Sequence, residues 1–480
     1  MNGTVARKGN SGVQVELPLV NHWLWAVALA GGVIVLLDGL SRPFTVVQDV
    51  APLTYEPPWL VFTFAVVTLP LCLLYASRSQ IPSHEGLLLW FVLCTVTYIK
   101  GFAYVKLPGG PIFVTDLVLG WLLYRIFVWP RWRWISARSW IVKLLYAFLA
   151  AGTVAAVRGI LSGHSILLVF RDSAIVGYAF FFLVGAYVIR NWEGITRLFL
   201  FVALGAGLST LHALSWFLAQ PGQRRYIGFG VYVLAALVGT LLLVINRRIP
   251  SGWGWALAAL FFCGLLLANA RTLFVSLGGL ALLIFCVGAS TQRKIAFARL
   301  KLAASLAAAG LVSLVLVSQT DAGIAFVERA SSELFSGTVE YADDATAQFR
   351  FLAWAEALAR LAVNPLLGEG YGVPFVFEMS EQDVRPHNSY LTVLYKMGLL
   401  GMVPLLMLLG YFHWQGWRSF LFHRKHKRAV LLYAVLLAHL AMCMYGGFNT
   451  LLESPYLAAV FWILMGVGYR AMALLRFEYG

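Results

Sequence analysis

The polar residues that could do chemistry gather in one long segment of an otherwise apolar chain, between Asp321 and Gly401. Near its end stands Arg385-Pro386-His387-Asn388-Ser389-Tyr390-Leu391, directly before an apolar run. Histidine is suited to take a proton from a hydroxyl group, because its ordinary pKa of about 6.5 lies close to neutral pH. A long polar stretch between two apolar runs is typical of a binding or active-site loop. We therefore expect His387 to be the chemical centre of the protein.

Arginine side chains suggest a second kind of chemistry, the binding of phosphate. The guanidinium group stays charged, and its planar donors bind phosphate oxygens in pairs. Five arginines map to the same predicted ends of apolar runs as the long polar segment: Arg158, Arg171, Arg224, Arg225 and Arg271. The alternative, that they only reach lipid headgroups, stays open.

The apolar runs that must position these residues set the fold class. The chain has 480 residues, of which 60% are hydrophobic and 12% charged, and its mean hydropathy is +0.79. An ordinary soluble domain has roughly 25% charged residues. A hydrocarbon core about 30 Å thick takes about twenty apolar residues per helix, so the runs predict an all-α polytopic membrane protein with about 12–14 transmembrane helices. The predicted spans lie near residues 23–41, 58–76, 86–104, 111–129, 140–157, 173–189, 198–218, 228–245, 253–269, 271–289, 302–319, 389–411, 429–446 and 455–475.

The basic residues predict the orientation of these spans. Lys and Arg cluster in alternate connections, including residues 131–138, 247–248, 293–301 and 424–428. Because such clusters mark the inner side of a membrane, both termini are predicted to be cytoplasmic and the long segment to face outward. The basic residues are scattered between apolar runs despite the formal net charge of +15, which argues against nucleic acid as a partner. The predicted organisation is a cytoplasmic tail (1–22), a transmembrane bundle (23–319), a large outer loop (320–388) and C-terminal transmembrane helices (389–480).

The outer loop contains a segment with helical spacing, from Gln348 to Leu361. Its larger apolar residues fall on one stripe, which predicts an amphipathic helix lying on the membrane or on the bundle. The stripe consists of Phe351, Trp354, Leu358 and Leu361. Aromatic residues of the loop, among them Trp354, Tyr371, Phe375 and Tyr390, could stack on sugar rings, although aromatics are also common at membrane interfaces.

Several of these motifs together resemble the O-antigen ligase and polymerase superfamily. The resemblance rests on Trp354, Asn364-Pro365, Gly368-Glu369-Gly370-Tyr371-Gly372, His387-Asn388-Ser389-Tyr390-Leu391 and Gly398-Leu399-Leu400-Gly401. Weaker upstream matches are Arg225 with Gly228, and Ala268-Asn269-Ala270-Arg271-Thr272. Members commonly have an acidic residue just before the Gly-Leu-Leu-Gly block, whereas this chain has Lys396-Met397.

The resemblance implies a GT-C-like membrane fold in the bacterial inner membrane, with its site in the periplasmic loop. It implies transfer of a glycan from an undecaprenyl diphosphate carrier to a hydroxyl of lipid A core or of a second lipid-linked repeat. His387 would then be the catalytic base, and Arg225, Arg271, Arg171 and Arg158 would bind the diphosphate. The expected acceptor and sugar contacts are Arg385, Asn388, Tyr390, Arg350 and Trp354.

Such a transferase is expected to be inverting and to need no metal or other cofactor, because arginines can neutralise the diphosphate. The five cysteines, Cys72, Cys94, Cys263, Cys286 and Cys443, lie in apolar runs and are interpreted as small buried hydrophobic residues. A different class of function fits many of the same residues: a flippase or transporter could bind a lipid-linked anionic glycan without reacting with it. The reaction product distinguishes the two hypotheses, since a flippase changes only the side of the membrane on which the glycan lies.

Overall fold

The computed structural model describes residues 22–41, 59–105, 112–128, 139–219, 227–246, 248–268, 270–289, 345–377 and 385–479. Within these ranges the chain is helical and contains no β-strand. The longer helices are α1 (His22–Ser41), α2 (Trp59–Arg78), α3 (Ser83–Tyr98), α5 (Val114–Val128), α6 (Trp140–Leu161), α7 (Ile166–Gly177), α8 (Phe181–Val188), α9 (Trp192–Ala219), α10 (Gly230–Ile245), α11 (Ser251–Ala268), α12 (Arg271–Ala289), α15 (Ala345–Val363), α16 (Ser389–Phe422), α17 (Ala429–Gly446) and α18 (Pro455–Tyr479), and a short α4 (Lys100–Ala103) follows α3.

The prediction of an all-α polytopic membrane protein is confirmed. In the described ranges, nine helical segments are long and apolar enough to cross a membrane, and two shorter apolar helices accompany them. The predicted spans near 140–157 and 429–446 correspond to α6 and α17. Helices α7 and α8 together form one apolar segment, Ile166–Val188. The predicted span near 302–319 lies outside the described residues.

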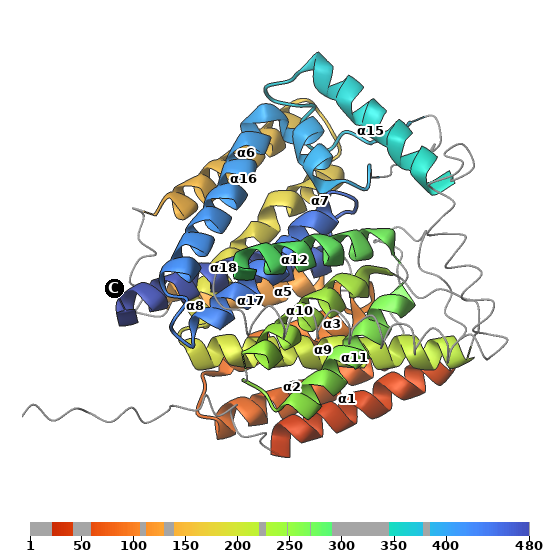
Figure 1. The fold of residues 1–480 in the computed structure, drawn as a ribbon. Coiled ribbons are helices and arrows are strands. Elements are labelled where there is room, and N and C mark those ends of the chain that lie inside the picture. Colours follow the sequence, from red (N-terminus) through yellow and green to blue (C-terminus); the bar gives the residue numbers. More distant parts are fainter. Residues whose placement is uncertain are drawn as a thin grey trace, which may run out of the picture.

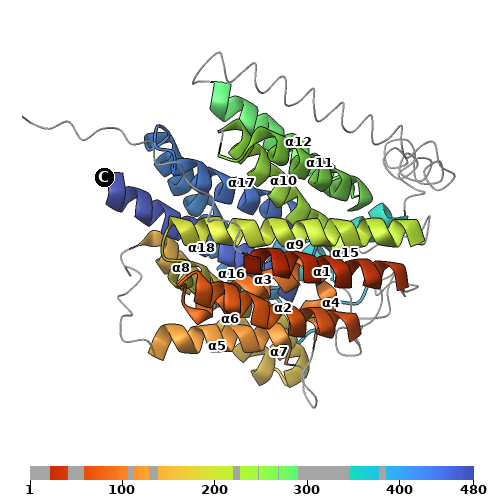
Figure 2. The same ribbon diagram turned by 90° about the horizontal axis from the view of Figure 1, so that it is seen from below.

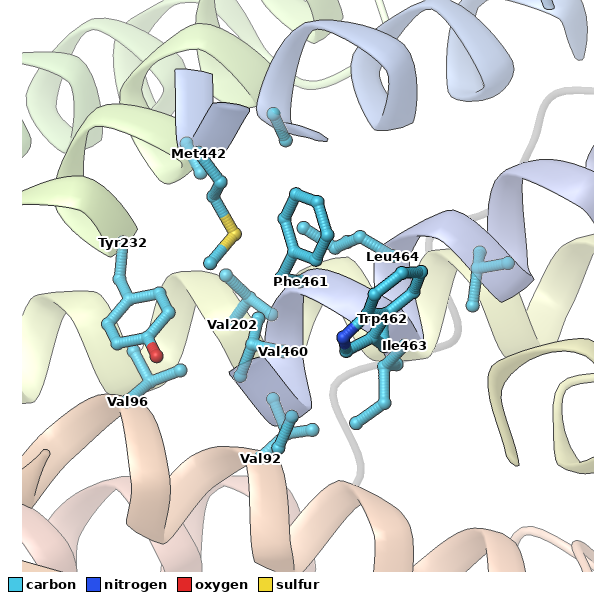
Figure 3. Packing of buried hydrophobic residues seen from close by; sticks show 14 of the residues in the cluster. Val92, Val96, Val202, Tyr232, Met442, Val460, Phe461, Trp462, Ile463 and Leu464 are labelled. Atoms are coloured by element: carbon cyan, nitrogen blue, oxygen red, sulfur yellow. The ribbon is translucent and has the colours of Figure 1, made fainter. Parts of the chain in front are cut away.

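The last two helices lie in the core of the bundle. In the apolar stretch of α17, 89% of the residues are buried, and in that of α18 78% are buried, whereas the share in α1 is 39%. A helix that is apolar all round belongs in the interior, where every face has a protein neighbour. Figure 3 shows Met442 of α17 and Val460 to Leu464 of α18 packed with side chains of α3, α9 and α10.

The outer helices leave apolar side chains uncovered. Trp25, Leu29 and Val66 are more than half exposed, as expected for side chains that contact lipid. Figure 2 shows α9 between α1 and α11, and α9 packs on both. Figure 1 shows α15 at the edge of the molecule, away from the C-terminal end of α18. We call the end of the bundle that carries α15 the loop end.

Helix α15 confirms the predicted amphipathic helix, but it packs through a different face. Ala353 and Ala357 are buried, in a small cluster with Phe375 and Tyr395 of α16. Phe351 and Leu358 of the predicted stripe are about half exposed, at 51% and 50%. The small residues allow the helix backbone to approach the protein closely. Phe351 and Leu358 are left outside, where they can contact a membrane surface.

Candidate functional site

The loop end is organised by a break in α16. Gly398 has φ 61° and ψ −161°, so the helix is interrupted there although both halves are helical. A break frees backbone donors and acceptors, and in an apolar bundle each must find another partner. The chain before α16 supplies those partners. Leu399 and Leu400 donate to the carbonyls of Pro365 and Leu366, at 2.9 and 3.0 Å.

The glycine-rich turn completes the repair from the other side of the break. Glu369 N–H donates to the carbonyl of Tyr395 at 2.8 Å, and Gly370 N–H donates to that of Lys396 at 2.9 Å. A Cβ on Gly398 would lie 2.4 Å from backbone atoms of Leu366. The two glycine motifs seen in the sequence therefore interlock, and each leaves room for the other's backbone.

Arg158 fastens the same turn to α6. Its guanidinium group donates to the carbonyls of Leu367 and Gly368, at 2.9 and 3.2 Å. Tyr371 N–H donates to the carbonyl of Ala155 at 3.2 Å. Arg158 was predicted to bind diphosphate, and in this structure its contacts hold the loop.

A buried carboxylate in α7 ties the loop to the bundle. Asp172 is fully buried, and its oxygens pair with Arg385 at 2.6 Å, Lys396 at 3.0 Å and Arg171 at 3.4 Å. It also accepts the N–H of Gly372 at 3.0 Å. These contacts give Lys396 a structural role: it is a buried cation that faces Asp172.

The same contacts describe two predicted binding residues. Arg385 was expected to contact sugar and Arg171 to contact diphosphate, and both face the carboxylate of Asp172. Burial lowers the pKa of the Arg385 guanidinium, but the Asp172 charge outweighs this effect and the net pKa is raised. Arg385 therefore remains a cation, held to α7 by a short ion pair.

His387 itself lies just before α16 in a left-handed conformation, with φ 50°. Such a φ is uncommon for a residue with a side chain and is maintained only by surrounding contacts. The preceding carbonyl, that of Pro386, accepts the indole N–H of Trp354 at 2.8 Å. The imidazole ring meets the ring of Phe349 edge-on, with 5.8 Å between their centroids. Helix α15 thus contacts both the histidine and the residue before it.

The imidazole of His387 is neutral at pH 7. Burial and, to a smaller extent, the charges of Arg350 and Lys100 together lower its pKa to about 4. The residue nevertheless keeps an exposed surface, so that solvent or a ligand can reach it. An accessible neutral imidazole is able to accept a proton.

Asn388 and Tyr390 hold the start of α16. The Asn388 side-chain oxygen accepts the N–H groups of Tyr390 and Leu391 at 3.0 and 3.1 Å, which is the standard arrangement of a helix N-cap. The Tyr390 hydroxyl donates to the carbonyl of Cys443 at 2.8 Å. Two other aromatic candidates, Tyr371 and Phe375, are fully buried, so the prediction that they stack on sugar rings is wrong.

The structure describes least the two arginines that belong to the upstream family matches. Arg225 and the side chain of Arg271 lie outside the described residues. The backbone of Arg271 begins α12, which starts beside the end of α11 and the beginning of α10, where Gly230 approaches Ala268 and Leu273. In α10 the Tyr232 hydroxyl donates to the carbonyl of Tyr456, at the start of α18.

Besides Asp172, two charged residues of the loop end were missed in the sequence. Glu453 accepts hydrogen bonds from the Ser389 and Thr392 hydroxyls, at 3.4 and 3.3 Å. Burial raises the pKa of its carboxyl group, against the lowering effect of Arg385. Lys100 acts on the His387 ring through its charge. The available signal for Glu453 was its position as the acidic residue between the last two apolar runs.

The fold and the site define a class of protein: a multi-pass membrane protein with an accessible histidine in a loop fastened to one end of the bundle. Residues 256–406 match the family described as O-Antigen ligase. The match runs from α11 into α16 and includes both glycine motifs and His387. Over these residues the match supports the resemblance to the O-antigen ligase and polymerase superfamily, and it indicates a membrane protein that modifies glycans. No match was found among curated proteins.

Proposed function

We propose that this protein transfers a glycan from an undecaprenyl diphosphate carrier to an acceptor hydroxyl, at the outer face of the bacterial cytoplasmic membrane. The observation that carries the proposal is His387: it is accessible, neutral, and held in an uncommon backbone conformation. It also lies within the part of the chain that matches the O-antigen ligase family.

The proposed reaction is a single displacement with inversion. The acceptor oxygen attacks the anomeric carbon and forms the new glycosidic bond, while the bond from that carbon to the carrier diphosphate breaks. The hydroxyl proton passes to the imidazole of His387, and the carrier leaves as undecaprenyl diphosphate. General base catalysis of this kind contributes typically 10²–10⁴-fold to a rate.

The charges around His387 support its role as the base. Arg350 and Lys100 lower its pKa in the free protein. A bound diphosphate would offset their charge, so the pKa of the imidazole would rise when the carrier binds. The base would thereby become stronger at the stage when a proton must be accepted.

Positive charge at the leaving group is assigned to Arg225 and Arg271. Diphosphate leaves with increased negative charge, which fixed guanidinium groups stabilise strongly in a site with little water. Arg171 is one third exposed, at 34% of its side chain, and it is a further candidate. Arg158 and Arg385 are assigned to holding the loop in place. We propose that the transfer needs no divalent cation, so that Mg²⁺ or Mn²⁺ added after chelation leaves the rate unchanged.

The distribution of Lys and Arg supports an orientation with both termini in the cytoplasm and α15 in the periplasm. The exposed apolar side chains of α15 fit a position on the outer leaflet. A lipid carrier in that leaflet would present its diphosphate at the height of the loop end. The acceptor would be lipid A core in a ligase or a second lipid-linked repeat in a polymerase.

The test is product analysis with purified protein in nanodiscs, supplied with an undecaprenyl diphosphate-linked glycan and each acceptor in turn. Transfer to lipid A core or extension of the lipid-linked glycan supports the proposal, together with release of undecaprenyl diphosphate in equal amount. If vesicles containing the protein move the carrier across the membrane and form no new glycosidic bond, the flippase hypothesis replaces it.

A further inference from the structure

Three potential metal ligands meet inside the bundle, away from the chemistry assigned to His387. His413 lies on the second half of α16, and His439 and Cys443 lie one turn apart on α17. His413 Nε2 is 3.1 Å from His439 Nδ1. Cys443 Sγ is 3.6 Å from His439 Nδ1 and 4.0 Å from His413 Nε2.

These separations are those of ligands around one metal ion. With bonds of about 2.0–2.1 Å to nitrogen and about 2.3 Å to sulfur, tetrahedral angles place two nitrogens about 3.4 Å apart and sulfur about 3.6 Å from nitrogen. Trigonal angles increase both separations by about 0.2 Å. Small side-chain adjustments would therefore convert the observed arrangement into either geometry.

The surroundings of the three side chains favour an ion of low charge. Phe461 stacks on the His439 ring with 4.3 Å between centroids, and the Phe412 ring meets it at 5.0 Å. An uncompensated charge in apolar surroundings is costly. A thiolate with two neutral imidazoles has one negative charge, so a monovalent cation gives a neutral site and a divalent cation gives a site with charge +1. Soft thiolate ligands favour Cu(I) and Zn²⁺ among common metal ions, and the charge balance favours Cu(I) of the two.

We propose that His413, His439 and Cys443 form a three-coordinate site for Cu(I). The site joins the second half of α16 to α17. Its Cys443 carbonyl accepts the hydroxyl of Tyr390, three residues after His387, so a bound ion would fix the part of α17 on which the start of α16 rests. The site is independent of the proposed glycan transfer, because none of the three side chains is assigned to that reaction.

The outer nitrogens of the two rings limit the affinity. His413 Nδ1 and His439 Nε2 have no hydrogen-bond partner in the described part of the chain. Metal-binding histidines usually donate this second N–H to an acceptor, and loss of that contact lowers metal affinity by about 10–100-fold. The expected site is therefore exchangeable, and a strong soluble Cu(I) chelator should remove the ion without unfolding the protein.

The experiment uses the full-length protein in detergent, titrated with Cu(I) under reducing, anaerobic conditions against a chromogenic Cu(I) chelator. One Cu(I) per chain is expected. Cys443→Ser and His439→Gln should each weaken Cu(I) binding by at least about tenfold, in line with the effect of losing supporting contacts alone. Cys263→Ser is the matched control, since Cys263 is a partly buried cysteine of α11 outside the cluster; it should bind Cu(I) as the wild type does.

A second measurement needs no variant. Alkylation of the wild-type thiols is followed by mass spectrometry of peptides, and Cu(I) should slow modification of Cys443 while leaving Cys263 unaffected. Equal Cu(I) affinity in Cys443→Ser, or no protection of Cys443 in the wild type, would overturn the proposal. Tighter binding of Zn²⁺ than of Cu(I) at this site would overturn the charge argument and the copper assignment with it.

Discussion

Replacement of Asp172 by Asn tests how the loop is fastened to the bundle. The substitution keeps the shape of the side chain and removes its charge from between Lys396 and Arg385, 3.0 and 2.6 Å away. At an effective dielectric constant of about 20, attraction at about 3 Å is worth about 6 kcal/mol before desolvation is subtracted. Measured losses after removal of one partner from a buried ion pair are about 3–5 kcal/mol. Lys396 is fully buried, so we expect a loss in that range.

Hydrogen exchange of peptides covering residues 365–377 measures this loss locally. A decrease of about 3–5 kcal/mol in the free energy of opening corresponds to exchange that is faster by a factor of about 10² to 4 × 10³, since about 1.4 kcal/mol is a factor of ten. The double variant Asp172→Asn with Lys396→Met removes both charges and should recover much of the protection. Glu356→Gln is the control: its ion pair with Arg360 involves a side chain that is 36% exposed, and we expect less than about 1 kcal/mol. Exchange in Asp172→Asn within threefold of the wild type would refute the reasoning.

Two further predictions follow from the loop end. Burial and neighbouring cations lower the pKa of His387 to about 4, so the imidazole stays unprotonated down to that pH. The kcat/KM for transfer should therefore fall only below about pH 5. Arg350→Gln removes one of the cations and should move this fall, the acid limb of the pH profile, to higher pH. An acid limb near pH 6.5 in the wild type would contradict the assigned environment. Gly398→Ala places a Cβ 2.4 Å from the Leu366 backbone, at a residue with a φ of 61°. It should destabilise the protein by about 2 kcal/mol or more, measured by thermal unfolding. The control is Gly410→Ala on the same helix, where no atom lies within 4 Å of the added Cβ; it should change stability by less than about 1 kcal/mol. Equal effects of the two alanines would show that the break in α16 does not require glycine.

The membrane helices could be predicted because their signal is local. A run of about twenty apolar residues must cross the bilayer with its backbone hydrogen-bonded, and neither condition depends on a partner elsewhere in the chain. His387 could be singled out for a similar reason, since it is a polar residue of a recognisable motif at the end of a long polar segment.

The anchor of the loop could not be predicted, because it depends on residues far apart in the sequence. Asp172 lies in an apolar run, and its partner Arg385 follows 213 residues later. Without that contact, Lys396 was only a departure from a family pattern. The packing face of α15 was also missed, because hydrophobicity identified Phe351 and Leu358 while the close approach of the helix is made by Ala353 and Ala357.

The cysteines show the same limitation. Cys443 considered alone has the character of a small apolar residue, and His439 four positions earlier places a second ligand on the same face of α17. The third ligand, His413, comes from another helix. Only the packing of α16 against α17 brings the three side chains together.

The most direct test of the central claim compares His387→Ala with His164→Ala in a purified transfer assay. His164 lies between α6 and α7, near Gly372 of the glycine-rich turn. It is the matched control, because no role in the reaction is assigned to it. His387→Ala should lower the transfer rate by about 10²–10⁴-fold and should still bind the lipid-linked carrier as the wild type does. His164→Ala should transfer normally. Wild-type transfer by a folded His387→Ala protein would contradict the assignment of His387 as the base.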